Sequence, residues 1–477
     1  MATITRFEDL EIWKLALQQC KDFDLLVEET ALAKNFELRN QMDASSGSVM
    51  DCIAEGFDRS GNSEFKNMLI IAKGSNAEFR SQLYRCLNRK HITQERFDLL
   101  TDKNILLGNK IMAFISYLQK TVYKGQRYKS GKALQPQTSN IKHQTSNLKL
   151  DIHTHIMPEH MPNWTQKFGY GEFIHLEHRN CEACMMKGDK VFRMVEANSY
   201  QADARIKEMN ETEVTIQVLS TIPVLFNYWA KPEDGYETAR FFNDHIAETV
   251  TKEPKRFIGL GTVPLQDIDL AIKEMDRCVT ELKMPGLEIG SNINGKNLSD
   301  KYFFPFYEAA EKAGCALFVH PWEMMGEDQM QKYWLPWLVG MPAETARAIC
   351  SMIFGGVFEQ FPKLRVAFAH GGGSFPFTIG RIKHGFDVRP DLVAVDNSVS
   401  PEEYIGKFWV DSLVHNKKSM EFLIDVMGED KICLGSDYPF PLGEHHPGKL
   451  IEKMKLGKKT EKKLLYKNAE DWLGVVE

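Results

Sequence analysis

Histidine and aspartate residues stand at the ends of short apolar runs that begin after residue 147. The first run ends in Asp-Ile-His-Thr-His, with His153 and His155, and later runs end at His320, His370 and Asp437. A single such histidine is usually a hydrogen-bonded structural residue, but packing does not explain the whole set. Neutral imidazole and carboxylate together suit a borderline divalent metal such as zinc. The pattern therefore predicts a site for one metal ion.

The spacing of these residues suggests a role for each. His153 and His155 are two residues apart, so both side chains point to the same side of a strand. With His320 and Asp437 they would supply the metal ligands and leave room for water. The metal would lower the pKa of that water and supply hydroxide. His370 would act beside it as general acid or base.

The candidate ligands belong to a regular alternation of strand-like and helix-like segments. Eight short runs are mostly apolar, as strands buried on both faces should be, and helical patterns separate most of them. This alternation predicts an α/β fold, a (β/α)8 TIM barrel over 148–477, with the active site at the carboxyl ends of the strands. A doubly wound open sheet is the alternative, but no Gly-rich phosphate loop follows the first strand. The expected strands are 148–155, 214–221, 257–263, 286–290, 316–320, 365–370, 408–412 and 432–437.

The first 121 residues contain helical patterns only. Apolar residues recur at helical spacing, for example at Leu10, Trp13 and Leu17. Four helices with short connections predict an all-α antiparallel four-helix bundle over 1–121. Residues 122–147 are polar and basic, and such a composition cannot bury enough apolar surface to offset chain entropy. We expect a disordered linker there, followed by the barrel.

Composition and charge exclude several classes of function. With 43% hydrophobic and 26% charged residues, the chain has the balance of a soluble globular protein. It contains no run of 18 apolar residues and no signal-peptide core after Met1, so neither a membrane partner nor export is expected. Nine cysteines without a regular framework favour reduced thiols in a cytoplasmic protein, and Cys181 and Cys184 are expected in a loop. The acidic excess after residue 150 gives no support for nucleic-acid binding.

Four motifs around the candidate ligands resemble those of the amidohydrolase superfamily. They are D-I-H-T-H at 151–155, F-V-H-P-W at 318–322, F-A-H-G-G-G at 368–373 and G-S-D-Y-P at 435–439. The resemblance is to the branch of mononuclear, non-hydrolytic decarboxylases. Many hydrolases of the superfamily hold two metals, bridged by a carboxylated lysine on the fourth strand. The corresponding stretch 286–290 has no lysine, which favours a single divalent ion, expected to be Zn²⁺.

Longer motifs narrow the resemblance within that branch. K-V-F-R at 190–193, Y-W-A-K-P-E-D at 228–234, the stretch 332–345 and F-P-F-T-I-G-R at 375–381 resemble the aminocarboxymuconate-semialdehyde decarboxylase family. The resemblance runs from about residue 149 to 474. It implies non-oxidative decarboxylation of 2-amino-3-carboxymuconate-6-semialdehyde to 2-aminomuconate-6-semialdehyde, in tryptophan or nitroaromatic degradation. It also implies that the four residues named above hold the metal and that His370 is catalytic.

The same resemblance implies which residues bind the dicarboxylate substrate. Its carboxylates would be held by Arg193 and by Arg381, the latter reaching in from the other subunit of a homodimer. Guanidinium groups grip carboxylates through two hydrogen bonds, which suits this role, although either arginine taken alone would be read as a solvated surface charge. The resemblance also implies a pocket lining, because four residues match positions that line the family's pocket: Lys187, Phe192, Met324 and Trp337. The alternative for these four residues is ordinary packing.

The N-terminal bundle carries a resemblance of its own. Motifs at 7–13, 53–57 and 72–79 resemble four-helix-bundle proteins encoded in ribosomal-RNA intervening sequences, whose members tend to oligomerise. Two alternative functions stay open. The barrel could catalyse another amidohydrolase-type reaction, as an aromatic acid decarboxylase or a hydrolase. Alternatively, the protein could act mainly as a scaffold through an oligomerising bundle.

Overall fold

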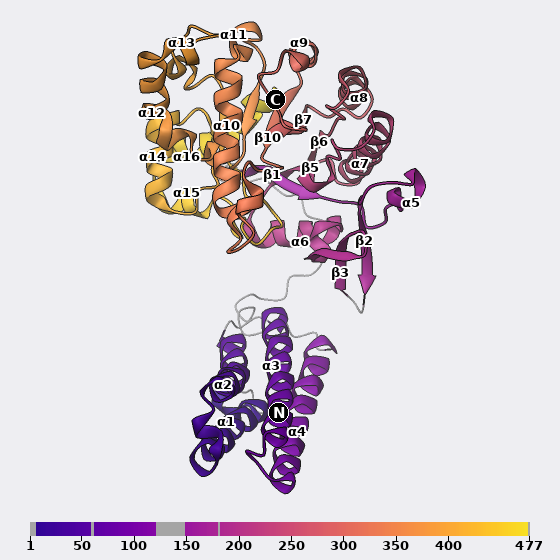
Figure 1. Cartoon of the computed structure of the whole chain (residues 1–477), viewed down its shortest axis with the longest axis vertical. Coiled ribbons are helices and arrows are strands. Elements are labelled where there is room, and N and C mark those ends of the chain that lie inside the picture. Colours follow the sequence, from indigo (N-terminus) through magenta and orange to yellow (C-terminus); the bar gives the residue numbers. More distant parts are fainter. Residues whose placement is uncertain (1–5, 59–61, 121–147, 180–181, 476–477) are drawn as a thin grey trace, which may run out of the picture. The chain divides into compact units, whose positions relative to one another are not determined.

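The computed structural model describes residues 6–58, 62–120, 148–179 and 182–475. Contacts within the chain divide it into two compact units, an N-terminal helical unit and a C-terminal α/β unit (Figure 1). Each unit has a hydrophobic core of its own. The linker expected at 122–147 lies outside the described residues.

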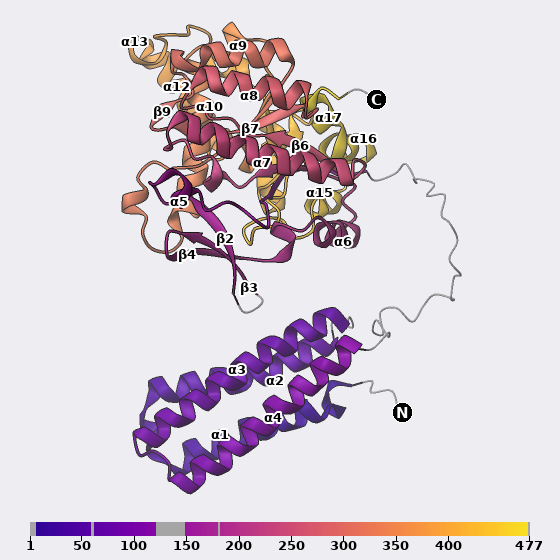
Figure 2. The same cartoon turned by 90° about the vertical axis from the view of Figure 1, so that its right-hand side faces the viewer.

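The described residues of the N-terminal unit form four α-helices, as the helical patterns predict, and two short 3-10 helices at Phe7–Asp9 and Ala31–Lys34. The helices lie side by side along their length (Figure 2), and all four contribute apolar side chains to two buried clusters. This packing stabilises helices that would be marginal alone in water. The bounds of the helices are Glu11–Glu29 (α1), Phe36–Asp58 (α2), Asn62–Asn88 (α3) and Gln94–Lys120 (α4).

A polar layer in the bundle joins three of these helices. Asn104 on α4 donates through Nδ2 to Oε1 of Gln19 on α1 (3.0 Å) and to the main-chain oxygen of Asn76 on α3 (2.8 Å). Asn76 donates back to the main-chain oxygen of Asn104 (3.0 Å), and all three side chains are buried. Buried polar groups are costly unless they are paired, so this layer disfavours any sliding of these helices against one another.

The C-terminal unit is built on eight parallel strands, in the sheet order β1-β5-β6-β7-β10-β11-β12-β13. All eight predicted strands are present in the predicted order, although several are shorter than predicted. Side chains inside the barrel, such as Ile152, Val218 and Phe318, are fully buried. The bounds are Leu150–Ile156 (β1), Ile216–Thr221 (β5), Phe257–Gly261 (β6), Gly286–Gly290 (β7), Ala316–His320 (β10), Val366–Phe368 (β11), Trp409–Asp411 (β12) and Ile432–Cys433 (β13).

The first and last strands meet and nearly close the sheet into a barrel. The N–H of Ile152 donates to the main-chain oxygen of Leu434 (2.8 Å). The buried carboxylate of Asp151 accepts hydrogen bonds from the main-chain N–H (3.1 Å) and the hydroxyl (2.5 Å) of Ser436, 285 positions further along the chain. The predicted (β/α)8 architecture is therefore confirmed.

Helices follow the strands and pack around the outside of the barrel, where a large apolar cluster fills the space between them. Helices α7, α8 and α9 cover one side in Figure 1, and α10, α12 and α14 cover the other. None of the described helices is long and apolar enough to cross a membrane. The principal bounds are Ala202–Thr212 (α6), Pro232–Lys252 (α7), Ile268–Thr280 (α8), Phe304–Ala313 (α9), Met341–Phe354 (α10), Phe375–Val388 (α12), Lys417–Met427 (α14), Lys449–Met454 (α15), Lys458–Lys462 (α16) and Asn468–Leu473 (α17). The shorter elements are Trp164–Phe168 (α5), Val357–Gln360 (α11), Pro390–Val393 (α13), Asn292–Ile293 (β8) and Lys296–Asn297 (β9).

A small antiparallel sheet, which the sequence patterns did not predict, is inserted between β1 and α6. It consists of Ile174–Arg179 (β2), Glu182–Lys187 (β3) and Lys190–Val195 (β4), paired in that order. The prediction of a loop at Cys184 is wrong, because this residue is buried on β3, while Cys181 lies outside the described residues. Many polar residues in these strands hid the strand pattern, as happens when one face of a sheet meets solvent.

Candidate metal centre and substrate pocket

Three histidines and one aspartate meet at the carboxyl ends of the barrel strands. His153 and His155 lie on β1, His320 ends β10, and Asp437 follows β13. One ligand atom from each lies within 4.8 Å of the others, and all four residues are buried. The barrel therefore brings together the four residues that were predicted from the sequence to be metal ligands.

Hydrogen bonds orient the three imidazole rings so that one nitrogen of each stays free. The Nδ1 atom of His153 bonds to Asp411 (2.7 Å), while those of His155 (2.9 Å) and His320 (3.0 Å) bond to main-chain oxygens. Because a carbonyl oxygen only accepts, Nδ1 of His155 and His320 carries the proton. The Nε2 atoms are buried and have no hydrogen-bond partner among the described residues. Three such nitrogens facing a carboxylate fit a divalent cation, and outer hydrogen bonds of this kind are typical of metal-binding histidines.

Asp437 is the anionic member of this cluster. Its Oδ1 atom lies 3.3 Å from Nε2 of His155 and 3.5 Å from Nε2 of His153. Burial opposes ionisation of the carboxyl group, but the adjacent imidazoles of His155, His370 and His153 outweigh it and hold the pKa of Asp437 well below its ordinary range. The group is therefore a carboxylate at neutral pH, as a metal ligand must be.

His370 stands beside the ligand set. It begins the turn after β11, and its ring centre lies 5.1 Å from those of His153 and His320. Its Nε2 atom is 3.9 Å from Oδ2 of Asp437. Burial and the neighbouring imidazoles lower the pKa of His320 well below its usual value, so the His320 imidazole is neutral. His370 thus lies where the sequence predicted a general acid or base.

Asp411 is a site residue that sequence reasoning missed. It ends β12, is fully buried, and accepts hydrogen bonds from His153 and from the main-chain N–H groups of His370 (2.8 Å) and Gly371 (2.7 Å). The signal that could have found it is the one used for the ligands, a polar residue at the carboxyl end of an apolar strand. It stands in F-W-V-D-S at 408–412.

Arg193 enters the cavity of the metal centre from β4. The centre of its guanidinium lies 4.7 Å from the Phe440 ring centre and 5.8 Å from that of Trp337. Burial lowers the pKa of Arg193, and the negative charge of Asp437 opposes that change. Among the described residues no carboxylate forms an ion pair with Arg193. The guanidinium is therefore available to an anionic ligand in the same cavity.

The other predicted pocket residues divide between this cavity and a neighbouring one. Phe192 and Trp337 line both cavities, while Lys187 and Met324 line the neighbouring one. The inserted antiparallel sheet carries Lys187 and Phe192, so it reaches the mouth of the barrel from outside. Sequence reasoning missed three further aromatic residues of the metal-centre cavity, because side chains in loops give no periodic signal. These are Trp322, Trp334 and Phe440.

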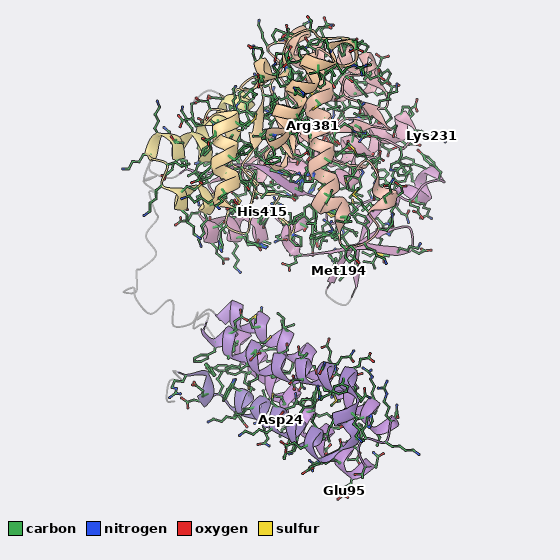
Figure 3. The ribbon with its side chains drawn as sticks, turned by 60° about the vertical axis from the view of Figure 1, so that its left-hand side comes forward. Asp24, Glu95, Met194, Lys231, Arg381 and His415 are labelled. Carbon is green, nitrogen blue, oxygen red and sulfur yellow. The ribbon has the colours of Figure 1, made fainter. Side chains whose placement is uncertain are left out.

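Arg381 lies apart from the metal centre of its own chain. It is exposed on α12 and is not among the residues that line either cavity. In Figure 3 it lies among the outer helices of the barrel unit. The role predicted for Arg381 is therefore one that only a second subunit could fulfil.

Comparison with known protein families agrees with this architecture. Residues 150–475 match the family model described as amidohydrolase, which covers more than half of the chain. Residues 8–113 match the model described as 23S rRNA-intervening sequence protein. The chain therefore belongs to the amidohydrolase family.

Individual relatives narrow this class. A 2-amino-3-carboxymuconate-6-semialdehyde decarboxylase of Dictyostelium discoideum is 58% identical, over 69% of this chain and 92% of the relative. One of Caenorhabditis elegans is 39% identical, over 69% and 95%. The structure of a 5-carboxyvanillate decarboxylase from Novosphingobium aromaticivorans, complexed with manganese, matches with a TM-score of 0.57 at 22% identity, over 69% of this chain and 96% of that chain. Among the amidohydrolases, the chain is a member of the 2-amino-3-carboxymuconate-6-semialdehyde decarboxylase family.

Proposed function

We propose that the barrel catalyses the non-oxidative decarboxylation of 2-amino-3-carboxymuconate-6-semialdehyde to 2-aminomuconate-6-semialdehyde. The observation that carries this proposal is a candidate metal site of four residues, three of which line one cavity with a guanidinium that has no ion-pair partner among the described residues. The relatives at 58% and 39% identity are named for this decarboxylation. Because a TIM barrel hosts many reactions, the residues of the site support this assignment more than the fold does.

Zinc is the ion that we assign to the metal centre. Imidazole nitrogen and carboxylate oxygen are common zinc donors, and a site with open coordination suits catalysis. The same donor set accepts manganese, which the solved 5-carboxyvanillate decarboxylase contains. When bound, such a cation lowers the pKa of water and so supplies a nucleophile at neutral pH.

In this proposal His370 acts as the general base and then as the general acid. Its ring stands at the edge of the metal centre, 3.9 Å from Asp437, and its Nδ1 atom has no hydrogen-bond partner in the described part of the chain. An imidazole in this position can take a proton from water and later return one to the carbon that loses CO₂. As CO₂ leaves, the double bond re-forms and the hydroxide that had added to the substrate is expelled, so the carboxyl group is replaced by hydrogen and the reaction consumes no oxidant.

Arg193 binds one carboxylate of the substrate. Its guanidinium is already desolvated by the Phe440 and Trp337 rings, so it loses little hydration when it pairs with an anion. A guanidinium donates two parallel hydrogen bonds to a carboxylate, which also orients the substrate. Lys187 lines the neighbouring cavity together with Glu172, Glu323 and Glu327, and Phe192, Met324 and Trp337 add apolar surface for the conjugated chain.

A homodimer would bring Arg381 to the site of its partner subunit. Helix α12 carries Phe377, Arg381, His384 and Val388 at a spacing that puts them on one face, and all four are exposed. Phe377 is 83% exposed and Val388 is 55% exposed. Large apolar side chains gathered on one exposed face are typical of interaction surfaces. We assign this face to the contact between two copies of the chain.

A reducing compartment suits this enzyme. The eight cysteines in the described part of the chain are all free thiols. Seven of them lie on or next to helices of the bundle or strands and helices of the barrel. Free thiols persist in the cytoplasm, where disulfides are rare. We propose a cytoplasmic enzyme that acts in tryptophan or nitroaromatic degradation.

The test is an assay of the purified full-length protein with freshly generated substrate, together with metal analysis. Loss of the absorbance of the substrate at a rate that follows metal content would support the proposal. Restoring metal-depleted protein with zinc or manganese separately would show which ion serves. An unchanged spectrum with metal-loaded protein, together with turnover of an aromatic monoacid, would point instead to another decarboxylase of the superfamily.

A further inference from the structure

Asp411 is a buried carboxylate whose hydrogen bonds reach two different parts of the metal centre. Its Oδ2 atom accepts from Nδ1 of His153 (2.7 Å) and from the main-chain N–H of His370 (2.8 Å). Its Oδ1 atom accepts from the main-chain N–H groups of Gly371 (2.7 Å) and Leu413 (3.0 Å). Each oxygen thus has two donors, so the charge of the carboxylate is satisfied although the side chain is fully buried.

His153 differs from the other two candidate histidine ligands in the partner of its Nδ1 atom. His155 and His320 hydrogen-bond to main-chain oxygens, and the Glu288 carboxyl group lies 3.6 Å from Nδ1 of His155, whereas His153 bonds directly to the Asp411 carboxylate. A carboxylate partner makes the imidazole more basic and fixes the orientation of the ring more strongly than a carbonyl does. The orientation of the His153 ring, and with it the direction in which its Nε2 atom faces, is therefore set by Asp411.

The turn at His370 depends on the same carboxylate. His370 and Gly371 have φ values of +57° and +61°, so both lie in the left-handed region, which is unfavourable for a residue with a side chain. Successive N–H groups in such a turn point to one side and form a concave binding place for an anion. Here the carboxylate of Asp411 occupies that place, and its two hydrogen bonds offset the conformational cost at His370.

We propose that Asp411 is a positioning residue that couples metal binding through His153 to the placement of His370. This inference rests on the proposed function, since it takes the four-residue cluster as the metal site and His370 as the proton carrier. The Oδ2 atom accepts hydrogen bonds from both the His153 ring and the main-chain N–H of His370. A displacement of the His153 ring would therefore shift the carboxylate and with it the turn at His370. By linkage, metal binding in turn stabilises the turn at His370.

Replacement of Asp411 by asparagine separates this coupling from a merely structural role. An asparagine side chain has only one oxygen. Its NH₂ group would therefore face N–H groups that donate hydrogen bonds to Asp411 in the wild type. Removal of such an outer partner typically weakens metal binding by about 10- to 100-fold. For Asp411→Asn we expect that loss in zinc affinity, measured by competition with a chelator. We also expect a lower kcat at saturating zinc, with KM nearly unchanged.

A matched control is Asp267→Asn, at the N-terminus of α8. Asp267 accepts a hydrogen bond from the N–H of Leu270 (3.0 Å) as a helix cap, and asparagine serves that purpose equally well. This variant should keep the zinc affinity and kcat of the wild type. If Asp411→Asn also keeps both, and loses only thermal stability, the coupling does not exist.

Hydrogen exchange on the wild-type protein tests the same inference without a variant. The amides of His370 and Gly371 should exchange several-fold more slowly in zinc-loaded than in zinc-depleted protein, while those of α8 serve as the internal reference. Equal exchange at 370–371 in the two forms, in a protein that demonstrably binds zinc, would overturn the inference. Failure of the wild type to bind zinc at all would instead overturn the proposed function.

Discussion

The guanidinium of Arg193 lies 4.7 Å from the centre of the Phe440 ring, and Phe440 follows the candidate metal ligand Asp437 by three positions. The loop after β13 therefore carries one candidate ligand of the metal centre and also contacts the arginine that we assign to a substrate carboxylate. This loop sets the distance between the reacting centre and the carboxylate anchor. A change in its course would alter both functions together.

Substitution of Arg193 should harm recognition of a dicarboxylate in particular. Hydrogen bonds to charged groups contribute about 1.5–3 kcal/mol, so Arg193→Ala should lower kcat/KM about 10- to 150-fold. Arg193→Lys should recover only part of this loss, because an ammonium group cannot form the two parallel hydrogen bonds of a guanidinium. Steady-state kinetics with the dicarboxylate and with a monoacid analogue would check this. An equal loss for both substrates would contradict the assigned role.

Loss of one metal ligand should remove both the ion and the activity. Because outer partners alone are worth about 10- to 100-fold, His320→Ala should lower zinc affinity and kcat/KM by at least about 100-fold. Metal content by mass spectrometry and turnover of the same sample would be compared. His175→Ala, on β2 outside the cluster, is the matched histidine control and should retain both. Full turnover by metal-free His320→Ala would refute a metal-dependent reaction.

Mixed dimers would test whether Arg381 acts across a subunit interface. Arg381→Ala and His370→Ala should each be nearly inactive alone. A mixed dimer has one site with both residues intact, so a random equal mixture should recover about a quarter of wild-type activity, as expected for a two-fold symmetric dimer with shared sites. The mixture would be prepared by unfolding and refolding the two variants together. Recovery no greater than the sum of the separate variants would exclude a shared site.

The barrel unit should not need the helical bundle for catalysis. The Dictyostelium relative is matched over 92% of its own length by 69% of this chain, and the match to the amidohydrolase family begins at residue 150. A protein of residues 148–477 should keep kcat and KM within about two-fold of the full chain, because each unit has its own core. Sedimentation of both proteins would show whether the bundle changes the oligomeric state. Collapse of activity on truncation would favour the scaffold hypothesis.

Acid should destabilise the barrel through His245 on α7. Burial lowers the pKa of His245 to about 4, and the nearby Lys252 adds to this effect. In the unfolded chain the pKa returns to about 6.5, so between pH 6.5 and 4 the unfolded state binds a proton that the folded state does not. Stability is therefore lost as pH falls through this window, by at most about 3 kcal/mol at 1.36 kcal/mol per pH unit. Urea unfolding of wild type and His245→Gln at pH 7 and pH 5 measures it. The variant should show a smaller fall, and an identical fall would rule His245 out.

The metal centre could be predicted from the sequence because its residues share one simple signal. His155 and His320 lie at or next to the carboxyl ends of apolar strands, Asp437 follows the last strand, and a parallel barrel brings all such ends to one mouth. Asp411 has the same signal, but its partners are a side chain on β1 and main-chain groups after β11. Those contacts depend on the register of neighbouring strands, which local patterns do not specify.

The pocket was predictable only in part. Arg193 and Phe192 lie on an inserted sheet whose half-polar strands showed no clear alternation, so only the resemblance to a family pointed to them. Phe440 and Trp334 lie in loops, whose courses are set by tertiary packing. Arg381 shows the remaining limit. Its exposure on α12 is a property of one chain, whereas its predicted role requires two.

The hydrogen bonds between Asp151 and Ser436, which join the first strand of the barrel to the segment after the last, have a consequence for the biosynthesis of this protein. Two of the four candidate ligands come from the first strand of the barrel, and the fourth comes from the segment that follows the last strand. During translation, a nascent barrel cannot present the full ligand set until residue 437 has left the ribosome and its segment has docked beside β1. Binding of an ion by all four candidate ligands would thus be a late event in biosynthesis, and a chain that ended before residue 437 would lack one of the four.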